Sequence, residues 1–343
     1  MTTPGVVVAP PDPSPGGAGG SRPTERGRAV LRFATENQWV LLLLLTVALG
    51  LLTASVNPRF LDQRNLISIL DQSAVLGLVA AGATLLIISG NFDISVGAII
   101  GLAAVTMAML VLQGVPEPIA MLVGIIVCVV ASVTNAVVAR MFRAPTFIVS
   151  LATLGIFTGI GLALTEGIIQ LVPDNFTFFS STRLMGLLPL VFAVSLVGFV
   201  VVGFILRSTR LGRRTYAVGD NPRAAFLAGI DVSRTTVVLF AINGVLLGIA
   251  AIMLISRIGS ALPSTGTGLE LRAIGAVVIG GVPITGGKGG VVGTFFGVLL
   301  LGVISNMLNM LRVNPFLQDI AFGLLIVLAI GISAIRTRNE PRR

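Results

Sequence analysis

Residues 66–112 read LISILDQSAVLGLVAAGATLLIISGNFDISVGAIIGLAAVTMAMLVL, two apolar runs separated by a short polar break. A helix that crosses a bilayer needs about 20 mostly apolar residues, and the runs at 66–89 and 94–112 are close to that length. The break is rich in glycine and contains an ionisable side chain, Asp93. Non-helical backbone at membrane depth is tolerated only where protein or water surrounds it. The stretch therefore predicts two membrane spans and a polar element enclosed by other spans.

The rest of the chain has the same apolar character. Of its 343 residues, 55% are hydrophobic and 11% are charged, and the mean hydropathy is +1.00. Soluble domains carry roughly 25% charged residues. A chain with so few charges cannot cover itself with a polar surface in water. We therefore expect an integral membrane protein with an all-α, polytopic fold.

About ten transmembrane helices are expected, with glycine-rich broken segments between some of them. The candidate spans are residues 39–56, 66–89, 94–112, 117–139, 145–165, 187–206, 235–256, 269–284, 290–311 and 316–336. The third and the eighth are the weakest candidates, and the eighth is short for a full crossing. If both turned back beside a neighbour, the chain would have eight spans.

The placement of cationic residues predicts the orientation. The chain has 23 Lys and Arg against 14 Asp and Glu, a net charge of +9. Most cations fall in loops on one side, and such loops are normally cytoplasmic. We therefore expect both termini in the cytoplasm and a bacterial cytoplasmic (inner) membrane. The expected parts are a disordered tail at 1–32, a transmembrane domain at 33–336 and a cytoplasmic tail at 337–343.

Several kinds of chemistry are excluded. The chain has no histidine, which removes histidine bases, Ser-His-Asp triads and histidine metal sites. The glycine-rich stretch 279–289 departs from a phosphate-binding loop, because Val282 stands where the first glycine is needed and Gly289 replaces the hydroxyl. We expect no catalytic residues, no metal and no cofactor, and the arginines mark topology rather than a nucleic-acid surface.

The break at Gly90–Gly97 allows two interpretations. Asp93 and Ser95 can cap the free N–H groups of the following helix. Ionisable groups inside a membrane are also usually functional, so Asn91, Asp93, Ser95 and Gly97 are candidates for a translocation pathway. Both interpretations can hold together.

A second candidate break contains Gly280 and Gly281. Its sequence, VIGGVPITGGKGGVVGTFFG, weakly resembles IISGNFDISVGAIIGLAA around the first break. Corresponding breaks in two halves of a transporter indicate a site at the repeat interface. The amide of Asn306 is a further candidate, either for that pathway or for a hydrogen bond between helices.

The cytoplasmic loop 207–234 is the longest polar stretch after the N-terminal tail. Asn221 and Pro222 form a helix start, with the asparagine as cap and the proline at the first position. Gly229 ends this two-turn helix, which has small apolar residues on one face. It either packs on its own protein or provides a docking surface for a soluble partner.

The motifs GNFDISVG, YAVGDNPRAAFLAGI and AIGAVVIGGVPITGGKGGVVGTFFGVLLLGVISNMLNML, in this order, resemble the permease subunits of ribose/xylose-type ABC importers. The resemblance extends from about residue 60 to 335. The family usually has a second glycine where Asn91 stands and an arginine where Lys288 stands. The first difference places an amide beside the break and leaves its role in substrate choice open.

The resemblance implies a permease that moves a monosaccharide by alternating access. Its expected partners are a second permease subunit, in a homo- or heterodimer, two cytoplasmic ATP-binding subunits and an extracytoplasmic solute-binding protein, all at or in the lipid bilayer. The family's ATPase-coupling segment maps onto Gly219, Asn221, Ala224, Ala225, Gly229 and Ile230. Power would therefore come from partner subunits that hydrolyse ATP, and this chain would not be an enzyme.

Other solutes and another class of protein remain open at this point. The same architecture could move a nucleoside, a sugar alcohol or an autoinducer-like furanose. A stand-alone secondary carrier or a membrane enzyme would be a different class. A proton-coupled carrier usually has ionisable residues inside its spans, and only Asp71 and Asp93 lie near them by this reading.

Overall fold

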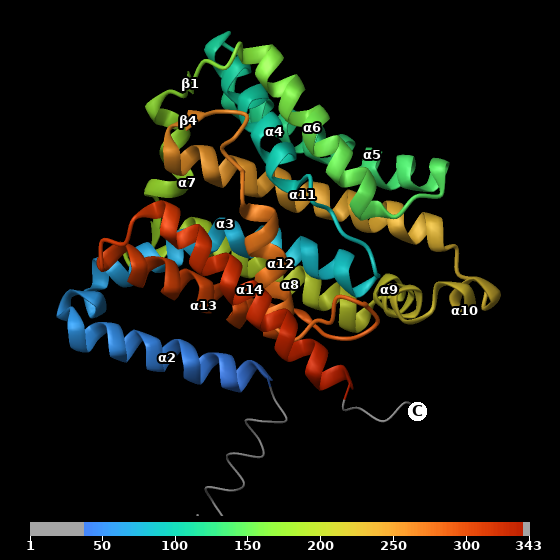
Figure 1. The fold of residues 1–343 in the computed structure, drawn as a ribbon. Helices are drawn as coiled ribbons and strands as arrows, with labels where there is room; N and C mark the ends of the chain where they lie inside the picture. Colours follow the sequence, from blue (N-terminus) through green and yellow to red (C-terminus); the bar gives the residue numbers. More distant parts are fainter. Residues whose placement is uncertain (1–37, 339–343) are drawn as a thin grey trace, which may run out of the picture. The chain divides into compact units, whose positions relative to one another are not determined.

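The computed structural model describes residues 38–338. The predicted tail at 1–32 and most of the predicted tail at 337–343 lie outside this range. The described part is built almost entirely from helices (Figure 1). The longer ones are α2 (Gln38–Val56), α3 (Gln63–Ile88), α4 (Val96–Leu112), α5 (Glu117–Phe142), α6 (Thr146–Thr165), α8 (Leu190–Ser208), α11 (Val232–Ile258), α12 (Leu269–Ile279), α13 (Val291–Met310) and α14 (Pro315–Arg338).

Short elements connect these helices. They are η1 (Pro58–Leu61), η2 (Asp174–Thr177), α7 (Phe178–Ser181), α9 (Arg210–Asp220) and α10 (Pro222–Leu227). Two antiparallel strand pairs lie in the connections: β1 (Gln170–Leu171) with β4 (Ser260–Ala261), and β2 (Arg183–Leu184) with β3 (Leu188–Pro189). The segment at 166–186 thus contains short helices and one strand of each pair.

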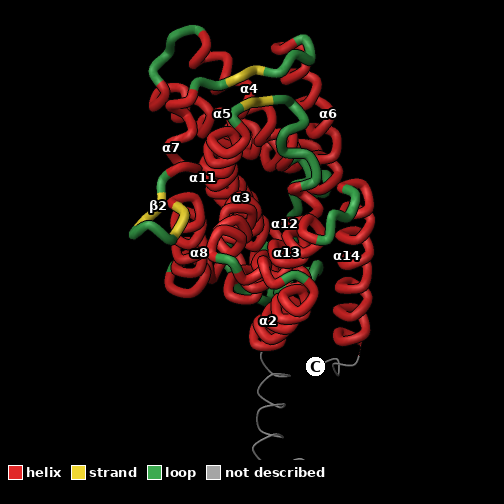
Figure 2. Tube along the Cα trace, turned by 90° about the vertical axis from the view of Figure 1, so that its left-hand side faces the viewer, coloured by secondary structure: helices red, strands yellow, loops and turns green. Residues whose placement is uncertain are grey.

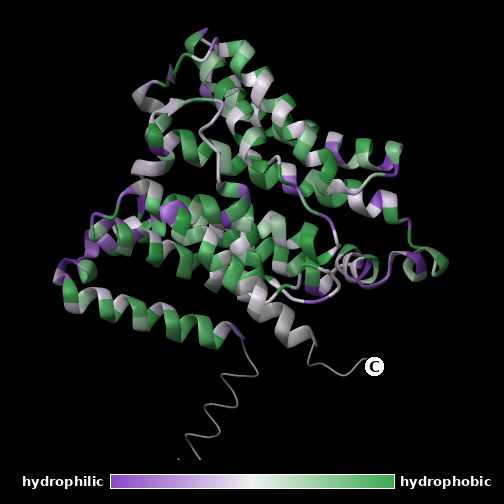
Figure 3. Ribbon diagram, in the orientation of Figure 1, coloured by the Kyte–Doolittle hydropathy of each residue, from purple (hydrophilic) through white to green (hydrophobic). Residues whose placement is uncertain are grey.

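Every predicted span contains one of the ten longer helices, which confirms an all-α polytopic membrane protein. Seven of the described helices are long and apolar enough to cross a membrane: α2, α3, α5, α6, α8, α11 and α13. Helix α4 is apolar but shorter. Helix α12 has 11 residues, so at 1.5 Å per residue it is about 16 Å long, half of the hydrocarbon thickness. Figure 3 shows hydrophobic residues along the helices and hydrophilic ones mainly in the connections, including α9 and α10.

Helices α3 and α11 form the centre of the bundle. Most residues of both helices are buried, whereas α2 faces outward along most of its length. In the view of Figure 2, α3 and α11 lie side by side, with α8, α2 and α14 toward the periphery. A helix that is apolar on all sides and buried is typical of the core of a membrane bundle. The two central helices therefore fix the positions of the segments that follow them.

Each central helix is followed by a non-helical break. Residues 89–95 follow α3 and lead into α4, and residues 259–268 follow α11 and lead into α12. Helices α3 and α11 run in opposite directions (Figure 1). The same order of elements thus occurs twice, from α3 to α6 and from α11 to α14. In this order the break at 259–268 follows a central helix as the first break does, whereas the stretch around Gly280 and Gly281 follows α12.

Glycines bring the central helices into close contact. Cβ atoms on Gly244 and Gly248 would approach the backbone of α5 to 2.6 Å, at Val129 and Ile125 respectively. Lipid tails are as apolar as the helices, so the hydrophobic effect does not drive helices together inside a bilayer. Close backbone packing is therefore a main source of helix association. The spacing of four residues puts both glycines on one face of α11.

Two buried polar oxygens also pack directly against glycines of neighbouring helices. A Cβ on Gly82 would collide with Oδ1 of Asn243, and one on Gly302 would collide with Oγ of Ser73. Neither oxygen has a hydrogen-bond partner among the described residues. Contacts between a Cα–H and an oxygen recur at helix–helix interfaces, and here they occupy acceptors that would otherwise be left empty.

The contact between α11 and α5 yields a direct test. We predict that Gly244→Leu will lower the amount of folded protein several-fold, since the side chain overlaps the α5 backbone. The measurement is the monodisperse peak in size-exclusion chromatography after solubilisation in mild detergent. Gly155→Leu is the control, because nothing lies within 4 Å of its Cβ position. Equal losses for the two variants would contradict the packing role of Gly244.

Candidate functional site

The first break is held by hydroxyl groups of α6. The backbone N–H of Phe92 donates to Oγ1 of Thr146 at 3.1 Å, and that of Ile94 donates to Oγ of Ser150 at 2.9 Å. Thr146 and Ser150 are four residues apart and therefore lie on one face of the helix. A buried N–H without a partner costs free energy comparable to a lost hydrogen bond. The α6 hydroxyls thus allow an extended segment to exist inside the bundle.

Asp93 is the centre of a buried polar cluster. Its Oδ1 accepts from the N–H of Ser95 at 3.0 Å, from the Ser95 hydroxyl at 2.6 Å and from Nδ2 of Asn135 at 3.2 Å. Asn135 in turn accepts from Oγ1 of Thr153 at 2.6 Å. The cluster joins the break to both α5 and α6.

The predicted capping by Ser95 is wrong, whereas Asp93 accepts the backbone N–H of Ser95 directly before α4. Helix α4 begins at Val96 after Ser95, and no side-chain oxygen of Ser95 accepts from the first turn. The Ser95 hydroxyl instead donates to Asp93. Asp93 Oδ2 is buried and has no hydrogen-bond partner within the described part of the chain. The carboxylate therefore fastens the break to its neighbours and leaves one oxygen unused.

Asn91 turns back on its own backbone. Its Nδ2 donates to the Ser89 carbonyl at 3.2 Å and to the Ser89 hydroxyl at 2.9 Å. The amide that distinguishes this chain from the usual family pattern is thus occupied by the turn after α3. It is half-buried and does not reach the Asp93 cluster by any hydrogen bond that the structure shows.

The break at 259–268, called the second break from here on, lies directly on α4. A Cβ on Gly101 would overlap the carbonyl oxygen of Pro263, and one on Gly97 would lie 2.5 Å from both the Gly266 carbonyl oxygen and Oε2 of Glu270. Gly97 is therefore the point where the two breaks meet. Glu270 is buried, its Oε1 accepts from the N–H of Gly268 at 3.0 Å, and its Oε2 has no partner among the described residues.

Glu270 was missed by the sequence analysis. It lies at the start of the span predicted at 269–284, where a carboxylate is easily assigned to a loop. The indication was present in the pattern, because a carboxylate in the first turn of an unusually short apolar helix suggests a helix that begins inside the membrane.

The remaining pathway candidates serve in packing. Gly280 contacts the backbone of Gly293, and a Cβ on either would overlap the other. Gly281 has φ of +92° and lies against Gln38. Asn306 and Asn65 exchange two amide hydrogen bonds of 2.9 and 3.0 Å, which tie α13 to α3. These residues hold helices together, and nothing in their geometry brings them to the Asp93 cluster.

The predicted helix in the loop 207–234 is confirmed. Helix α10 runs from Pro222 to Leu227, and Oδ1 of Asn221 accepts from the N–H groups of Arg223 and Ala224 at 3.1 and 3.0 Å. Gly229 has φ of +81°, a conformation that favours glycine, and it follows the helix end. The rest of the loop also contains α9, which the sequence analysis did not predict.

Most residues of α10 are exposed. Ala225 is 4% exposed and packs against its own protein. Phe226 and Leu227 are 69% and 79% exposed, and Ala224 and Ala228 are also exposed. Two large apolar side chains are thus exposed on a segment that is otherwise polar and rich in arginine. We call Phe226 and Leu227 the apolar tip of α10.

Two predicted coupling residues also contact their own chain. The N–H of Ile230 donates to the Ala225 carbonyl at 3.0 Å, which closes the turn after α10. Gly219 lies against the end of α3, where a Cβ would overlap the carbonyl oxygen of Ile88. Neither residue belongs to the exposed tip.

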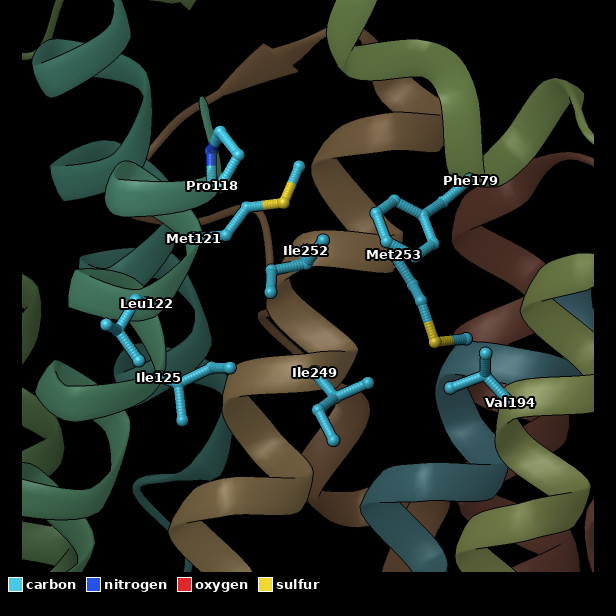
Figure 4. A pocket seen from close by; sticks show the side chains of 9 residues that line it. All are labelled: Pro118, Met121, Leu122, Ile125, Phe179, Val194, Ile249, Ile252 and Met253. Atoms are coloured by element: carbon cyan, nitrogen blue, oxygen red, sulfur yellow. The ribbon is translucent and has the colours of Figure 1, made fainter. Parts of the chain in front are cut away.

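A pocket of about 420 Å³ lies between α5, α8 and α11, roofed by α7 (Figure 4). Its lining is entirely apolar and includes Met121, Ile252 and Met253. Such a lining offers no hydrogen bond to a polar solute. Across residues 38–338, no group of three His, Cys, Asp or Glu side chains could hold a metal ion.

Comparisons with known proteins give a consistent result. Residues 65–330 match the family model described as the permease component of the branched-chain amino acid transport system. The ribose import permease protein RbsC of Bacillus subtilis (strain 168) is 37% identical over 285 residues, which cover 82% of this chain and 88% of that protein. The autoinducer 2 import system permease protein LsrC of Escherichia coli O9:H4 (strain HS) is 32% identical, over 92% of each chain. No solved structure matches the chain.

The hydroxyl groups of α6 can be tested one at a time. We predict that Ser150→Ala will lower the free energy of unfolding by about 1–3 kcal/mol, because the buried N–H of Ile94 loses its acceptor. Unfolding of the purified protein by SDS in mixed micelles, followed by circular dichroism, measures this change. Ser55→Ala is the control, since that exposed hydroxyl bonds only to its own helix. A loss no greater than the control's would show that the break does not depend on Ser150.

Proposed function

Because the chain belongs to the family of permease components of the branched-chain amino acid transport system, we propose that it is the membrane subunit of an ATP-driven sugar importer. Relatives in this family import ribose and autoinducer 2 according to their names. The substrate of this chain is then a monosaccharide or a related small polar solute. The observation that carries the coupling part of the proposal is the exposed apolar tip of α10.

The polar groups inside the bundle fit an uncharged solute with many hydroxyls. Around the first break they are mostly hydroxyls and amides, namely those of Thr146, Ser150, Thr153 and Asn135. Such groups exchange hydrogen bonds with a sugar without the desolvation cost of a charged pair. The two buried carboxylates, Asp93 and Glu270, are each bonded through one oxygen to backbone or side-chain donors.

We propose ten crossings with both termini in the cytoplasm. The break 89–95 and α4 together make the third crossing, and the break 259–268 and α12 together make the eighth. This assignment puts α9, α10 and their arginines on the cytoplasmic side, in line with the positive-inside rule. The membrane is then the bacterial cytoplasmic (inner) membrane.

The assembly contains two copies of such a permease, as a homodimer or a heterodimer, and two ATP-binding subunits at the α10 tips. A solute-binding protein delivers the solute at the opposite end. ATP binding draws the ATP-binding subunits together and moves α10 with them. The breaks then change the side to which the pathway opens, which is alternating access driven from outside the membrane. The permease itself carries out no chemical step.

Transport by the assembled complex tests this function. Proteoliposomes that contain the permease with its ATP-binding subunits and solute-binding protein are expected to accumulate radiolabelled ribose, or autoinducer 2, only when ATP is supplied on the α10 side. Uptake that proceeds equally well without any ATP-binding subunit would contradict the importer and indicate a stand-alone carrier.

The apolar tip of α10 gives a prediction at the level of one residue. We expect Phe226→Ala to reduce co-purification of the ATP-binding subunits about tenfold or more, as for a buried aromatic anchor worth about 2 kcal/mol. The protein should still fold, because Phe226 is exposed in the free permease. Leu187→Ala removes a similarly exposed apolar side chain at the opposite end and should retain the ATP-binding subunits. Retention by Phe226→Ala as well would remove the tip from the interface.

A further inference from the structure

Three segments meet where α9 ends. They are the end of α3 at Ile88, the end of α9 at Gly219 and Asp220, and the glycine-rich connection between α12 and α13. The N–H of Gly287 donates to the carbonyl oxygen of Ile88 at 2.8 Å. This hydrogen bond joins two connections that are about 200 positions apart in the sequence. We call this contact the backbone joint.

Gly219 lies on the joint itself. Its Cβ position falls on the Ile88 carbonyl oxygen and 2.7 Å from the nitrogen of Gly287, the two atoms that form the hydrogen bond. Any side chain at residue 219 would therefore push the two connections apart or push α9 away from them. Both neighbours are backbone atoms, so no side-chain rotation can relieve the overlap.

The other side of the joint also consists of backbone. Gly286 and Gly287 have φ of +80° and +75°. A Cβ on Gly286 would lie 2.9 Å from the nitrogen of Gly90, and one on Gly287 would lie 2.9 Å from Cα of Asp220. Glycine is favoured here both by the conformation and by the space. The segments of the joint can therefore shift little against one another, because their contacts are between backbone atoms.

A side chain adds a second attachment one turn earlier in α9. The hydroxyl of Tyr216 donates to the carbonyl oxygen of Gly289 at 2.8 Å. Burial raises the pKa of this phenol, so it stays protonated and able to donate at neutral pH. Tyr216 and Gly219 lie on the same face of α9 and hold it against the same connection.

The joint is placed between the α10 tip and both parts of the membrane domain that would have to move. One residue, Asn221, separates α9 from α10. On the other side, Ile88 is four residues before Phe92, where the α6 hydroxyls begin to hold the first break. The connection at 286–289 leads directly into α13. A displacement of α10 therefore reaches both membrane connections through contacts between backbone atoms.

We propose that Gly219 and Tyr216 are positioning residues that transmit the movement of α10 to the first break and to the α12–α13 connection. They do not touch the solute, and they do not belong to the surface that binds the ATP-binding subunits. Their function is to make α9 and the two connections move as one body. This inference rests on the proposed importer function and specifies how its two ends are coupled.

The test compares uptake with ATP hydrolysis in the same proteoliposomes. In Gly219→Ala, ATP hydrolysis by the assembled complex should continue while solute uptake per ATP hydrolysed falls about tenfold or more, since a contact between backbone atoms is forced open. Tyr216→Phe loses one hydrogen bond, so its ratio should fall about two- to tenfold. Radiolabelled ribose and released phosphate are the two readouts.

The controls separate coupling from folding. Gly155→Ala adds the same methyl group on α6 with nothing within 4 Å, and its ratio should equal that of the unmodified protein. A purely structural role for Gly219 would lower uptake and hydrolysis together and leave their ratio unchanged, which would overturn the inference. If Gly219→Ala does not assemble, Tyr216→Phe decides, and an unchanged ratio in that variant overturns the inference.

The result also distinguishes this inference from the importer function itself. If the unmodified complex takes up solute only with ATP while both variants keep its ratio, the importer stands and the joint is not its transmission. If the unmodified complex shows no dependence on ATP, the proposed function fails first.

Discussion

The non-helical segment at 92–95 requires partners for its backbone N–H groups, and this requirement governs the arrangement around it. The α6 hydroxyls of Thr146 and Ser150 serve as acceptors for two of these groups. Asp93 and Asn135 tie the same segment to α5. Because these bonds hold the break, α3 can end at the α10 side of the bundle and α4 can begin part of the way across. The second break, at 259–268, is also non-helical, and it packs on Gly97 and the start of α4.

Glycine is the second constraint, and it acts differently in the interior and at the backbone joint. In the interior, Gly82 and Gly97 give buried oxygens of Asn243 and Glu270 a place beside a Cα–H group. In the joint, glycines let three stretches of backbone touch directly. The first use stabilises a fixed bundle. The second connects a soluble segment to the membrane connections, which is the property that a machine driven from outside the bilayer needs.

Much of the fold was predictable, because apolar runs, arginine placement and the cap at Asn221 are properties of neighbouring residues in the sequence. The motifs around the first break and α10 also led to the family. The partners of the break were not predictable, since Thr146, Ser150 and Thr153 look like ordinary hydroxyls on an apolar helix. Only the fold brings the first two to the backbone of the break and the third to Asn135. The exposed residues of α10 were not predictable either, because only the fold shows that packing against the protein's own surface buries Ala225 and leaves Phe226 outside.

The proposed importer combines a solute path in the membrane with a segment at one end of it that partner subunits move. Its most direct test is whether the state of the ATP-binding subunits alters the first break. In a Cys128→Ala background, Ile94→Cys can be labelled with a water-soluble maleimide in the assembled complex, with and without ATP and vanadate. The account predicts that trapping the nucleotide changes the labelling rate several-fold in the unmodified joint, and that Gly219→Ala suppresses this change. A labelling rate at residue 94 that is the same in both nucleotide states would contradict it.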